Sequence, residues 1–199
     1  MNIVFIPNIN LGNSRNTPYH YSIKSWQKWS KQYDDVKVIE WDEAIMDFNK
    51  FKITLQRYWV HDILKHNKIE YEQVLVVDAD TIIHPNCPNF FELTDGKFST
   101  SFCNGDFEWV NRSIKGYSQK FFDTDYLMMA SDFFQTGFVI LNKDHEEFLN
   151  YVIDFYWKNQ NFCNYLLQRI KLLKFQPLQK NQLSHSLRFF DQFVDYKLS

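Results

Sequence analysis

The chain of 199 residues has few of the features that mark several common classes of protein. Its three cysteines, Cys87, Cys103 and Cys163, are odd in number, widely spaced and without a C-x-x-C pair. This pattern favours reduced thiols in a cytoplasmic protein over a disulfide framework. None of the six histidines stands in a zinc-binding spacing such as H-E-x-x-H. No apolar run approaches membrane-spanning length, and the N-terminal MNIVFIPNIN predicts a strand entering a polar loop rather than a signal peptide.

Charge and glycine patterns exclude two further classes. The formal net charge is −2 and the sequence has no basic block, so nothing marks a nucleic-acid footprint. The absence of G-x-G-x-x-G argues against a dinucleotide site. Hydrophobic residues make up 45% of the chain and aromatic residues 19%, which excludes disorder. We therefore expect a single domain over residues 1–199 with a substantial core.

The most informative stretch is QVLVVDADTIIHP, residues 73–85. The aliphatic run Val74–Val77 predicts a strand buried on both faces, as in the middle of a parallel sheet. Strand geometry places Asp78 and Asp80 on one side and Ala79 on the other. Neighbouring carboxylates repel each other, and a divalent cation that prefers oxygen ligands, Mn²⁺ or Mg²⁺, relieves this repulsion. Ligands of open α/β sheets bind at such strand ends, although an ordinary solvated strand end is the alternative.

Other segments predict the rest of an α/β sheet. Strands are expected at residues 2–7, 36–41, 73–79, 98–103 and 138–142. Helices are expected at residues 19–32, 53–66 and 161–174, with a short helical turn at 89–93 and a further helix capped by Asp144 with Glu147 at capping-box spacing. Residues 104–125 show no clear periodicity and predict an irregular segment of the kind that carries binding specificity.

The D-A-D-T motif at residues 78–81, at the end of a buried strand, resembles the nucleotide-sugar-dependent glycosyltransferases of the GT-A fold. It is most similar to the glycogenin and lipopolysaccharide galactosyltransferase type, over residues 53–142. The resemblance implies a GT-A-like, Rossmann-type α/β fold with a mixed, mostly parallel sheet flanked by helices. It also implies that Asp78 and Asp80 hold Mn²⁺ or Mg²⁺ at the diphosphate of the donor, expected to be a UDP-sugar, which Ala79 would also contact. The chain is short for this family, so we expect a domain that is compact or trimmed at its C-terminus.

A second matching piece is FFQTGFVILN, residues 133–142. The family usually has Asn-Ser-Gly before an aliphatic strand here, lining the donor sugar. The resemblance therefore assigns Gln135 and Thr136 to hydrogen bonds with sugar hydroxyls and Gly137 to close backbone approach. Gln135 in place of asparagine leaves the identity of the sugar open, and an ordinary β-turn is the alternative.

The polar loop at residues 8–18 follows the first expected strand. In the GT-A family this loop surrounds the nucleoside, which makes Asn8, Asn10 and Tyr19 candidates for contacts with base and ribose. An ordinary surface loop is an equally good interpretation of each residue taken singly.

Two further donor contacts are expected near the second strand and the next helix. Asp42 follows the strand and is placed to meet a ribose hydroxyl, although it could equally cap a helix starting at Glu43. Arg57 is preferred to Lys52 as the phosphate contact, because its planar guanidinium can bind two oxygens. A solvated helix face is expected for Lys52.

The C-terminal part departs from the family. Glycogenin-like enzymes carry a His-x-x-Gly-x-Lys-Pro-Trp element whose histidine completes the metal shell, and here only Ser184-His185-Ser186-Leu187-Arg188 offers a counterpart. His185 is the candidate third ligand. Asp132 and Asp106 are candidate bases if transfer inverts the sugar, and Gln135 completes the candidate catalytic group. The glycogenin likeness favours retention.

The leading hypothesis is a metal-dependent glycosyltransferase that transfers sugar to a hydroxyl of a glycan or another acceptor. A degenerate GT-A domain that binds nucleotide or glycan without turnover is the non-enzymatic alternative. A phosphatase of the haloacid dehalogenase type also carries a strand ending in Asp-x-Asp, with the first Asp as nucleophile. That signature requires Thr or Val where this chain has Ile82, and it usually opens the chain.

Overall fold

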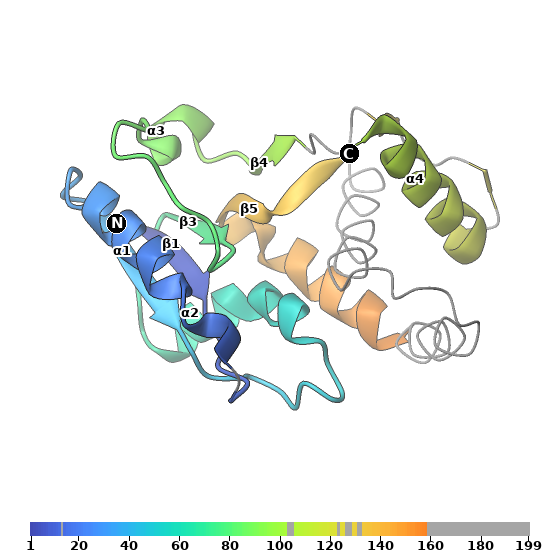
Figure 1. The fold of residues 1–199 in the computed structure, drawn as a ribbon, viewed down its shortest axis with the longest axis horizontal. Coiled ribbons are helices and arrows are strands. Elements are labelled where there is room, and N and C mark those ends of the chain that lie inside the picture. Colours follow the sequence, from blue (N-terminus) through green and yellow to red (C-terminus); the bar gives the residue numbers. More distant parts are fainter. Residues whose placement is uncertain (13, 103–105, 123, 126–128, 131–132, 159–199) are drawn as a thin grey trace. The chain divides into compact units, whose positions relative to one another are not determined.

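The computed structural model describes residues 1–12, 14–102, 106–122, 124–125, 129–130 and 133–158 (Figure 1). The chain divides into two compact units, the first made of Met1–Thr100 and Gly137–Glu147. The rest of the described chain belongs to the second unit, and the boundary between Thr136 and Gly137 falls within a strand. The single domain expected from the length stays a prediction.

Five strands form one sheet in the order β2-β1-β3-β5-β4. Their bounds are Asn2–Pro7 for β1, Val36–Trp41 for β2, Gln73–Val77 for β3, Ser99–Phe102 for β4 and Phe134–Asn142 for β5. β1 runs parallel to both β2 and β3, whereas β5 runs antiparallel to β3. This arrangement confirms the expected mixed, mostly parallel sheet flanked by helices. β3 ends two residues earlier than expected, and β5 begins four residues earlier.

The two central parallel strands are buried along their length. Ile3–Ile6 of β1 are fully inaccessible to solvent, and Val74–Val77 of β3 are at most 3% exposed. Side chains that alternate along these strands pack against both faces of the sheet, which is why both strands are apolar runs rather than alternating patterns. The double burial predicted for the strand before Asp78 is confirmed.

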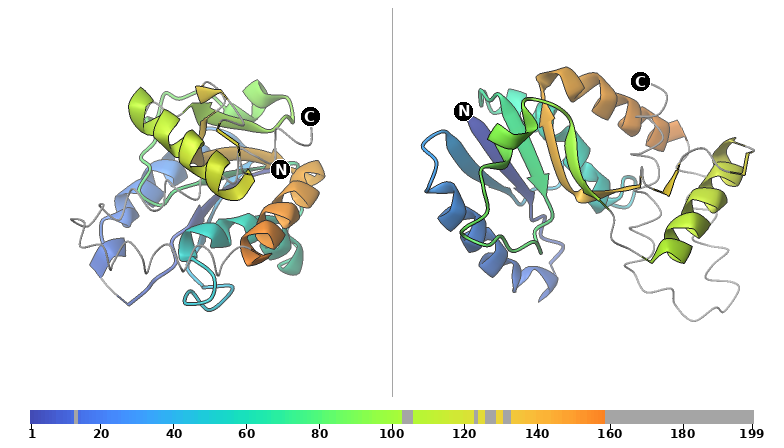
Figure 2. Two further views of the ribbon diagram at one scale, coloured as in Figure 1. Left: turned by 90° about the vertical axis from the view of Figure 1, so that its right-hand side faces the viewer. Right: turned by 90° about the horizontal axis from the view of Figure 1, so that it is seen from above.

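Helix α1, Tyr19–Ser30, covers one face of the sheet (Figure 2). Ile23, Trp26 and Trp29 lie on one stripe of the helix and pack in a core with alternate residues of β1 and β3. Pro18 precedes the first turn, where the missing N–H costs no hydrogen bond. The expected helix at residues 19–32 is therefore confirmed, although it ends two residues earlier.

The helix expected at residues 53–66 is divided. Residues Ile53–Trp59 form a 3₁₀ helix, η2, and Val60–His66 form α2. The Gln56 side chain is buried in η2, where Oε1 accepts from the N–H of Ile45 at 2.7 Å and Nε2 donates to the carbonyl of Met46 at 2.9 Å. These bonds join η2 to the loop that precedes it, and the sequence pattern could not predict them. A 3₁₀ segment such as η2 is common at the N-terminal end of an α-helix, here α2.

Two later segments correct the sequence-based expectations. Residues Phe107–Phe122, which lie in the segment expected to be irregular, form helix α4 in the second unit. Val110 and Ile114 of α4 are buried together with Phe133. The expectation of an irregular segment is therefore wrong. The apolar spacing of residues 107, 110 and 114 is helical, but polar residues separate these positions and hide the period.

The helical cap after β5 also lies elsewhere than predicted. Asn142, not Asp144, is the N-cap of the short 3₁₀ helix η4, Lys143–His145. Its Oδ1 accepts from the N–H of Asp144 at 2.9 Å, and its own N–H donates to Nδ1 of His145 at 3.0 Å. Residues 146–158 continue as a helix.

The remaining helical predictions have mixed outcomes. Helix α3, Phe90–Thr94, confirms the expected short turn, and its N-cap Asn89 accepts from the N–H of Phe91. The helix expected at residues 161–174 lies outside the described residues. Within the described part of the chain, no helix combines the length and apolar character needed to cross a membrane.

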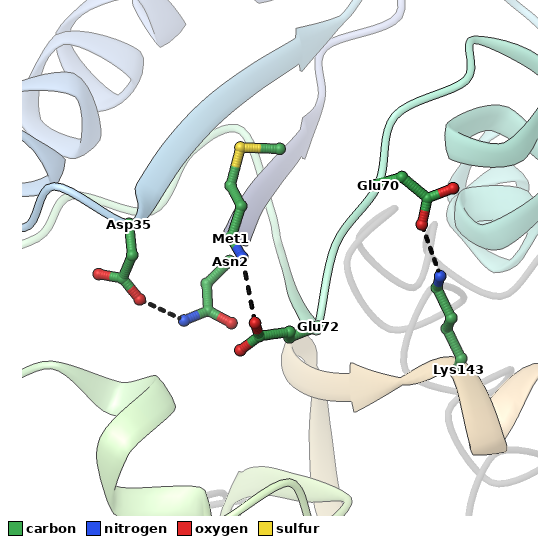
Figure 3. A network of polar contacts seen from close by, with 6 residues as sticks. All are labelled: Met1, Asn2, Asp35, Glu70, Glu72 and Lys143. Carbon is green, nitrogen blue, oxygen red and sulfur yellow. Dashed lines mark hydrogen bonds and ion pairs between the residues drawn. The ribbon is translucent and has the colours of Figure 1, made fainter.

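Polar contacts join the amino ends of β1 and β3 to their surroundings. Figure 3 shows the six residues that make them: Met1, Asn2, Asp35, Glu70, Glu72 and Lys143. The terminal ammonium of Met1 lies 3.5 Å from the Glu72 carboxylate, and Nζ of Lys143 lies 2.9 Å from Oε2 of Glu70. Both carboxylates are exposed. Ion pairs this exposed contribute little to stability. The candidate functional residues lie at the opposite, carboxyl end of β3.

Candidate functional site

Asp78 and Asp80 lie at the carboxyl end of β3, as expected. Asp78 follows the last strand residue, and the N–H of Thr81 donates to the Asp78 carbonyl at 3.0 Å, which closes a tight turn. Ala79 is buried in the core beneath this turn, whereas Asp80 is exposed and Asp78 half-buried. The buried alanine anchors the turn, which carries an exposed carboxylate at Asp80 and a half-buried one at Asp78.

The Asp78 carboxylate pairs with the guanidinium of Arg57. Nη2 of Arg57 lies 2.5 Å from Oδ1 of Asp78, and the two side chains are only 12% and 28% exposed. Nε of Arg57 donates to the Thr54 carbonyl at 2.7 Å, which anchors the guanidinium on η2. A sheltered ion pair of this kind fixes the orientation of both groups more firmly than an exposed pair. Arg57, the basic residue preferred from the sequence, therefore lies beside Asp78.

Gly137 of β5 lies directly against Asp78. The N–H of Asp78 donates to the Gly137 carbonyl at 3.0 Å, and Val77 is paired in register with Phe138. A Cβ atom at position 137 would overlap the Asp78 carboxylate. The prediction that the start of this strand lies beside the end of β3 is thus confirmed at Gly137, where a side chain has no room.

The other two residues of the Gln135-Thr136-Gly137 motif belong to the second unit. Thr136 is buried, with 6% of its surface exposed, and the side chain of Gln135 lies outside the described part of the structure. Their expected contacts with the donor sugar stay predictions.

Asn8, a candidate nucleoside contact, ties the loop after β1 to the neighbouring strand. Its Nδ2 donates to Oε1 of Glu40 at 2.6 Å, and its Oδ1 accepts from Nδ2 of Asn16 at 2.8 Å. Asn16 also donates to the Asn8 carbonyl at 3.1 Å. At the end of β2 the sequence-based hypothesis preferred Asp42 to Glu40 as the acidic residue of interest. The bonds of Asn8 to Glu40 and Asn16 carried no signal in the sequence.

Asn10, Tyr19 and Asp42 occupy the same end of the sheet. Oδ1 of Asn10 accepts from the N–H of Gly12 at 2.8 Å, and its own N–H donates to the Asp42 carbonyl at 3.4 Å. Oη of Tyr19 accepts from Nε of Arg15 at 3.1 Å. Asp42 is exposed, and because no helix begins at the next residue, its alternative role as an N-cap is wrong. The contacts of all three residues with a nucleoside stay predictions.

Asp78 and Asp80 are the candidate cation ligands at the carboxyl end of β3. Among the described residues, no three His, Cys, Asp or Glu side chains are placed to share a metal ion. His185, the expected third ligand, lies outside the described residues. The carboxylate oxygens of Asp78 and Asp80 are the type of ligand that Mn²⁺ or Mg²⁺ takes, and such ions are commonly held by one or two carboxylates together with substrate phosphates. The expected role of both residues as metal ligands stays a prediction.

The two candidate bases fall in the second unit. Asp132 lies outside the described residues. Asp106 caps α4, because its Oδ1 accepts from the N–H of Glu108 at 2.9 Å and its carbonyl accepts from the N–H of Val110 at 2.9 Å. This capping role explains an acidic residue at position 106 without any catalysis, and its role as a base stays a prediction.

A buried titratable pair lies away from these residues, on α2 and before β3. Nδ1 of His61 lies 2.5 Å from Oη of Tyr71, while Nε2 of His61 has no hydrogen-bond partner among the described residues. Burial lowers the pKa of His61 to about 4. Burial, with smaller contributions from Glu146, Glu70 and Asp62, raises the pKa of Tyr71 to about 12. The pair belongs to the core, where the shifted pKa of His61 makes the stability of the fold depend on pH.

Comparisons with known proteins agree with this architecture. The sequence matches no protein-family model and no curated protein. Among solved structures, the chain is similar to a glycosyltransferase involved in the glycosylation of the major capsid of PBCV-1. The TM-score is 0.52 at 12% sequence identity, and the match covers 80% of this chain and 67% of that chain. The protein therefore has a glycosyltransferase-like fold, although this similarity does not extend to the glycogenin type in particular.

Proposed function

We propose that the protein is a metal-dependent glycosyltransferase that transfers a sugar from a nucleotide-diphosphate sugar to a hydroxyl of a glycan or another acceptor. A UDP-sugar is the first donor to test. The observation that carries the proposal is the position of Asp78, which lies at the carboxyl end of a central strand, paired with Arg57 and packed against Gly137. On a glycosyltransferase-like fold, this is where a donor diphosphate is expected.

Each of these residues has a distinct chemical task. Asp78 and Asp80 would hold Mn²⁺ or Mg²⁺, which when bound neutralises negative charge on the leaving diphosphate. Arg57 keeps Asp78 in one orientation, and a guanidinium is the type of group that binds phosphate oxygens in pairs. Gly137 leaves room for the Asp78 carboxylate. His185 remains the proposed third ligand.

The remaining candidate residues are assigned to the donor sugar and to the base. Gln135 and Thr136 are proposed to hydrogen-bond the donor sugar, which would orient its anomeric carbon for attack. We propose retention of configuration, as the glycogenin likeness implies. Asp132 and Asp106 are the bases to test if the product shows inversion.

Two alternative functions would give different results in the experiment described below. A degenerate domain would bind the nucleotide without turnover. A phosphatase of the haloacid dehalogenase type would require Asp78 to act as a nucleophile. The Arg57–Asp78 ion pair and the antiparallel β5 beside Asp78 favour the transferase, because they suit a diphosphate site on a glycosyltransferase-like fold.

The decisive experiment incubates the full chain with Mn²⁺, a panel of nucleotide sugars and a mixture of glycan acceptors, with water as the acceptor where no glycan reacts, and measures release of the free nucleoside diphosphate. The proposal predicts release with at least one donor, and predicts that EDTA abolishes it. Metal-dependent binding without release would support the degenerate domain. If no nucleotide sugar binds, or if release is unaffected by EDTA, the metal-dependent transferase is refuted.

A further inference from the structure

The segment that follows the two carboxylates has no regular structure, yet its backbone is extensively bonded. Residues 82–84 form no helix, strand or turn, and a turn at 85–86 follows. The Thr81 carbonyl accepts from Oγ of Ser22 at 2.5 Å and from Nε1 of Trp26 at 2.9 Å. Both donors belong to α1, more than fifty residues earlier in the chain. Partly buried backbone outside a sheet needs such partners, because water cannot satisfy it.

Further bonds join the same segment to α1 and to the residues just after it. The N–H of Ile83 donates to Oγ of Ser25, and the Cys87 carbonyl accepts from Nε1 of Trp29, both residues of α1. Gln32 and Tyr33, which follow α1, donate to the carbonyls of Pro85 and Cys87. Helix α1 and the residues after it therefore support the stretch that leads away from the carboxylates. Of the bonded residues in this segment, Thr81 is the one that directly follows Asp80.

The Thr81 residue is bonded on both sides. Its N–H closes the turn on the Asp78 carbonyl at 3.0 Å, while its carbonyl is held by Ser22 and Trp26. Asp80 lies inside this turn and is exposed, so its position depends on the backbone that carries it. Ser22 and Trp26 are themselves 2% and 1% exposed, which keeps their hydrogen bonds away from competing water.

We infer that Ser22 and Trp26 are positioning residues, which hold the Asp78–Thr81 turn so that Asp80 meets the same cation as Asp78. The inference rests on the proposed function, since the cation is the one that binds the donor diphosphate. A metal ion requires its ligands at defined distances, and a turn that moves by a fraction of an ångström weakens binding without unfolding the protein.

The chain offers a closely matched control in Trp29. Trp26 and Trp29 lie one turn apart on α1, pack edge to face at 5.6 Å and are both almost fully buried. Each donates its indole N–H to a backbone carbonyl at 2.9 Å, Trp26 to Thr81 and Trp29 to Cys87. Replacement of either by Phe removes the same atoms, so a purely structural role predicts the same outcome for both.

The experiment compares full-length Trp26→Phe and Trp29→Phe by calorimetric titration of UDP or GDP at several Mn²⁺ concentrations. We expect similar losses of Tm in both variants. We expect Trp26→Phe to weaken the Mn²⁺-dependent affinity about 5- to 10-fold, the equivalent of one hydrogen bond, with no comparable change in Trp29→Phe. Equal weakening in both variants, or none in either, would overturn the inference.

A second pair covers the case in which the tryptophan variants fold poorly. Ser22→Ala removes a bond to the Thr81 carbonyl, whereas Ser30→Ala removes a bond of similar type to Gln27 within α1. Both serines are buried. We expect only Ser22→Ala to weaken the Mn²⁺-dependent affinity, and equal effects of the two would argue against the inference.

A readout without nucleotide separates this inference from the proposed function. Hydrogen exchange at the Thr81 amide reports opening of the turn directly. We expect faster exchange at Thr81 in Trp26→Phe than in Trp29→Phe. If the wild-type protein binds no nucleotide, the proposed function fails while the exchange rates still decide whether Trp26 holds the turn. If nucleotide binds and exchange at Thr81 is unchanged, the inference fails alone.

Discussion

The guanidinium of Arg57 and the carboxylate of Asp78 form an ion pair of 2.5 Å at the carboxyl end of β3. The pair joins η2 to the first of two closely spaced carboxylates, and both partners are largely sheltered from solvent. Asp78 is thereby held in place from one side by Arg57, while the Gly137 backbone bounds it on another. The first two predictions test this arrangement of Arg57 and Gly137 around Asp78.

Replacement of Arg57 by Ala should lower both stability and donor turnover. The sheltered Asp78 carboxylate would lose its partner, which should destabilise the fold by about 1–2 kcal/mol, between the values for exposed and fully buried pairs. Arg57→Lys should recover part of the stability but less of the turnover, because an ammonium lacks the planar set of donors. Urea denaturation and kcat/KM measure the two effects.

The control for Arg57 is Arg112, whose pair with Glu108 on α4 is exposed, with side chains 69% and 77% accessible. Arg112→Ala should change stability by less than about 0.5 kcal/mol and leave turnover unchanged. Equal effects of the Arg57 and Arg112 variants would show that the ion pair with Asp78 has no special function.

Replacement of Gly137 by Ala should displace the Asp78 carboxylate, because the added Cβ atom overlaps it. We expect a loss of metal-dependent nucleotide affinity of about 10-fold or more, the equivalent of about 1.4 kcal/mol. Gly116, in the interior of α4, is the matched control, since a Cβ there meets no atom within 4 Å. Gly116→Ala should stabilise the protein by up to about 1 kcal/mol and leave affinity unchanged. Unchanged affinity in Gly137→Ala would exclude a role for the Asp78 carboxylate in that orientation.

Replacement of Asp80 by Asn should abolish metal-dependent nucleotide binding with little effect on folding. The side chain is exposed, so the change removes a ligand charge and no core volume. Calorimetry with and without Mn²⁺ measures the first effect, and thermal denaturation the second. The control is Asp34→Asn, also at an exposed carboxylate. If Asp80→Asn binds nucleotide with an unchanged metal dependence, the cation site lies elsewhere.

The sequence was sufficient to place the central strand and its carboxylates, because an uninterrupted aliphatic run before Asp78 admits few other interpretations. The contact between Arg57 and Asp78 could not be predicted in the same way. It depends on the rotation of η2 about its axis, and the link of residues 66–73 between helix and strand did not determine that register. The bonds from Ser22 and Trp26 to Thr81 were also beyond reach, since side chain to backbone bonds over more than fifty residues leave no periodic signal.

Local features of the sequence explain the wrong predictions for the helix cap after β5 and for α4. Asn142 and Asp144 are both good N-caps, and the structure uses Asn142 because β5 continues to that residue and His145 is placed to complete the capping box. In α4, polar positions between Val110 and Ile114 obscured a helical spacing that was present in the sequence.

The buried His61 couples stability to pH. Its side chain is 3% exposed, and burial lowers its pKa from 6.5 to about 4, with Glu146 raising it and His145 lowering it to smaller extents. Between these two pH values the unfolded chain binds a proton at this position that the folded chain excludes. The free energy of unfolding attributable to His61 is therefore fully present above pH 6.5 and decreases as the pH falls toward 4.

Urea denaturation of the wild-type protein at intervals from pH 7 to pH 4.5 should accordingly show a decrease in the free energy of unfolding of up to about 3 kcal/mol from this group. His61→Phe, which keeps an aromatic ring at the buried position, should flatten the pH dependence, even if it changes the stability at pH 7. The matched change is His66→Gln at the exposed end of the same helix, which should leave the slope as in the wild type. A wild-type slope retained in His61→Phe would assign the pH dependence to other groups. Asp62 is not one of them, because burial raises its pKa, and a carboxylate with a raised pKa favours the folded chain as the pH falls.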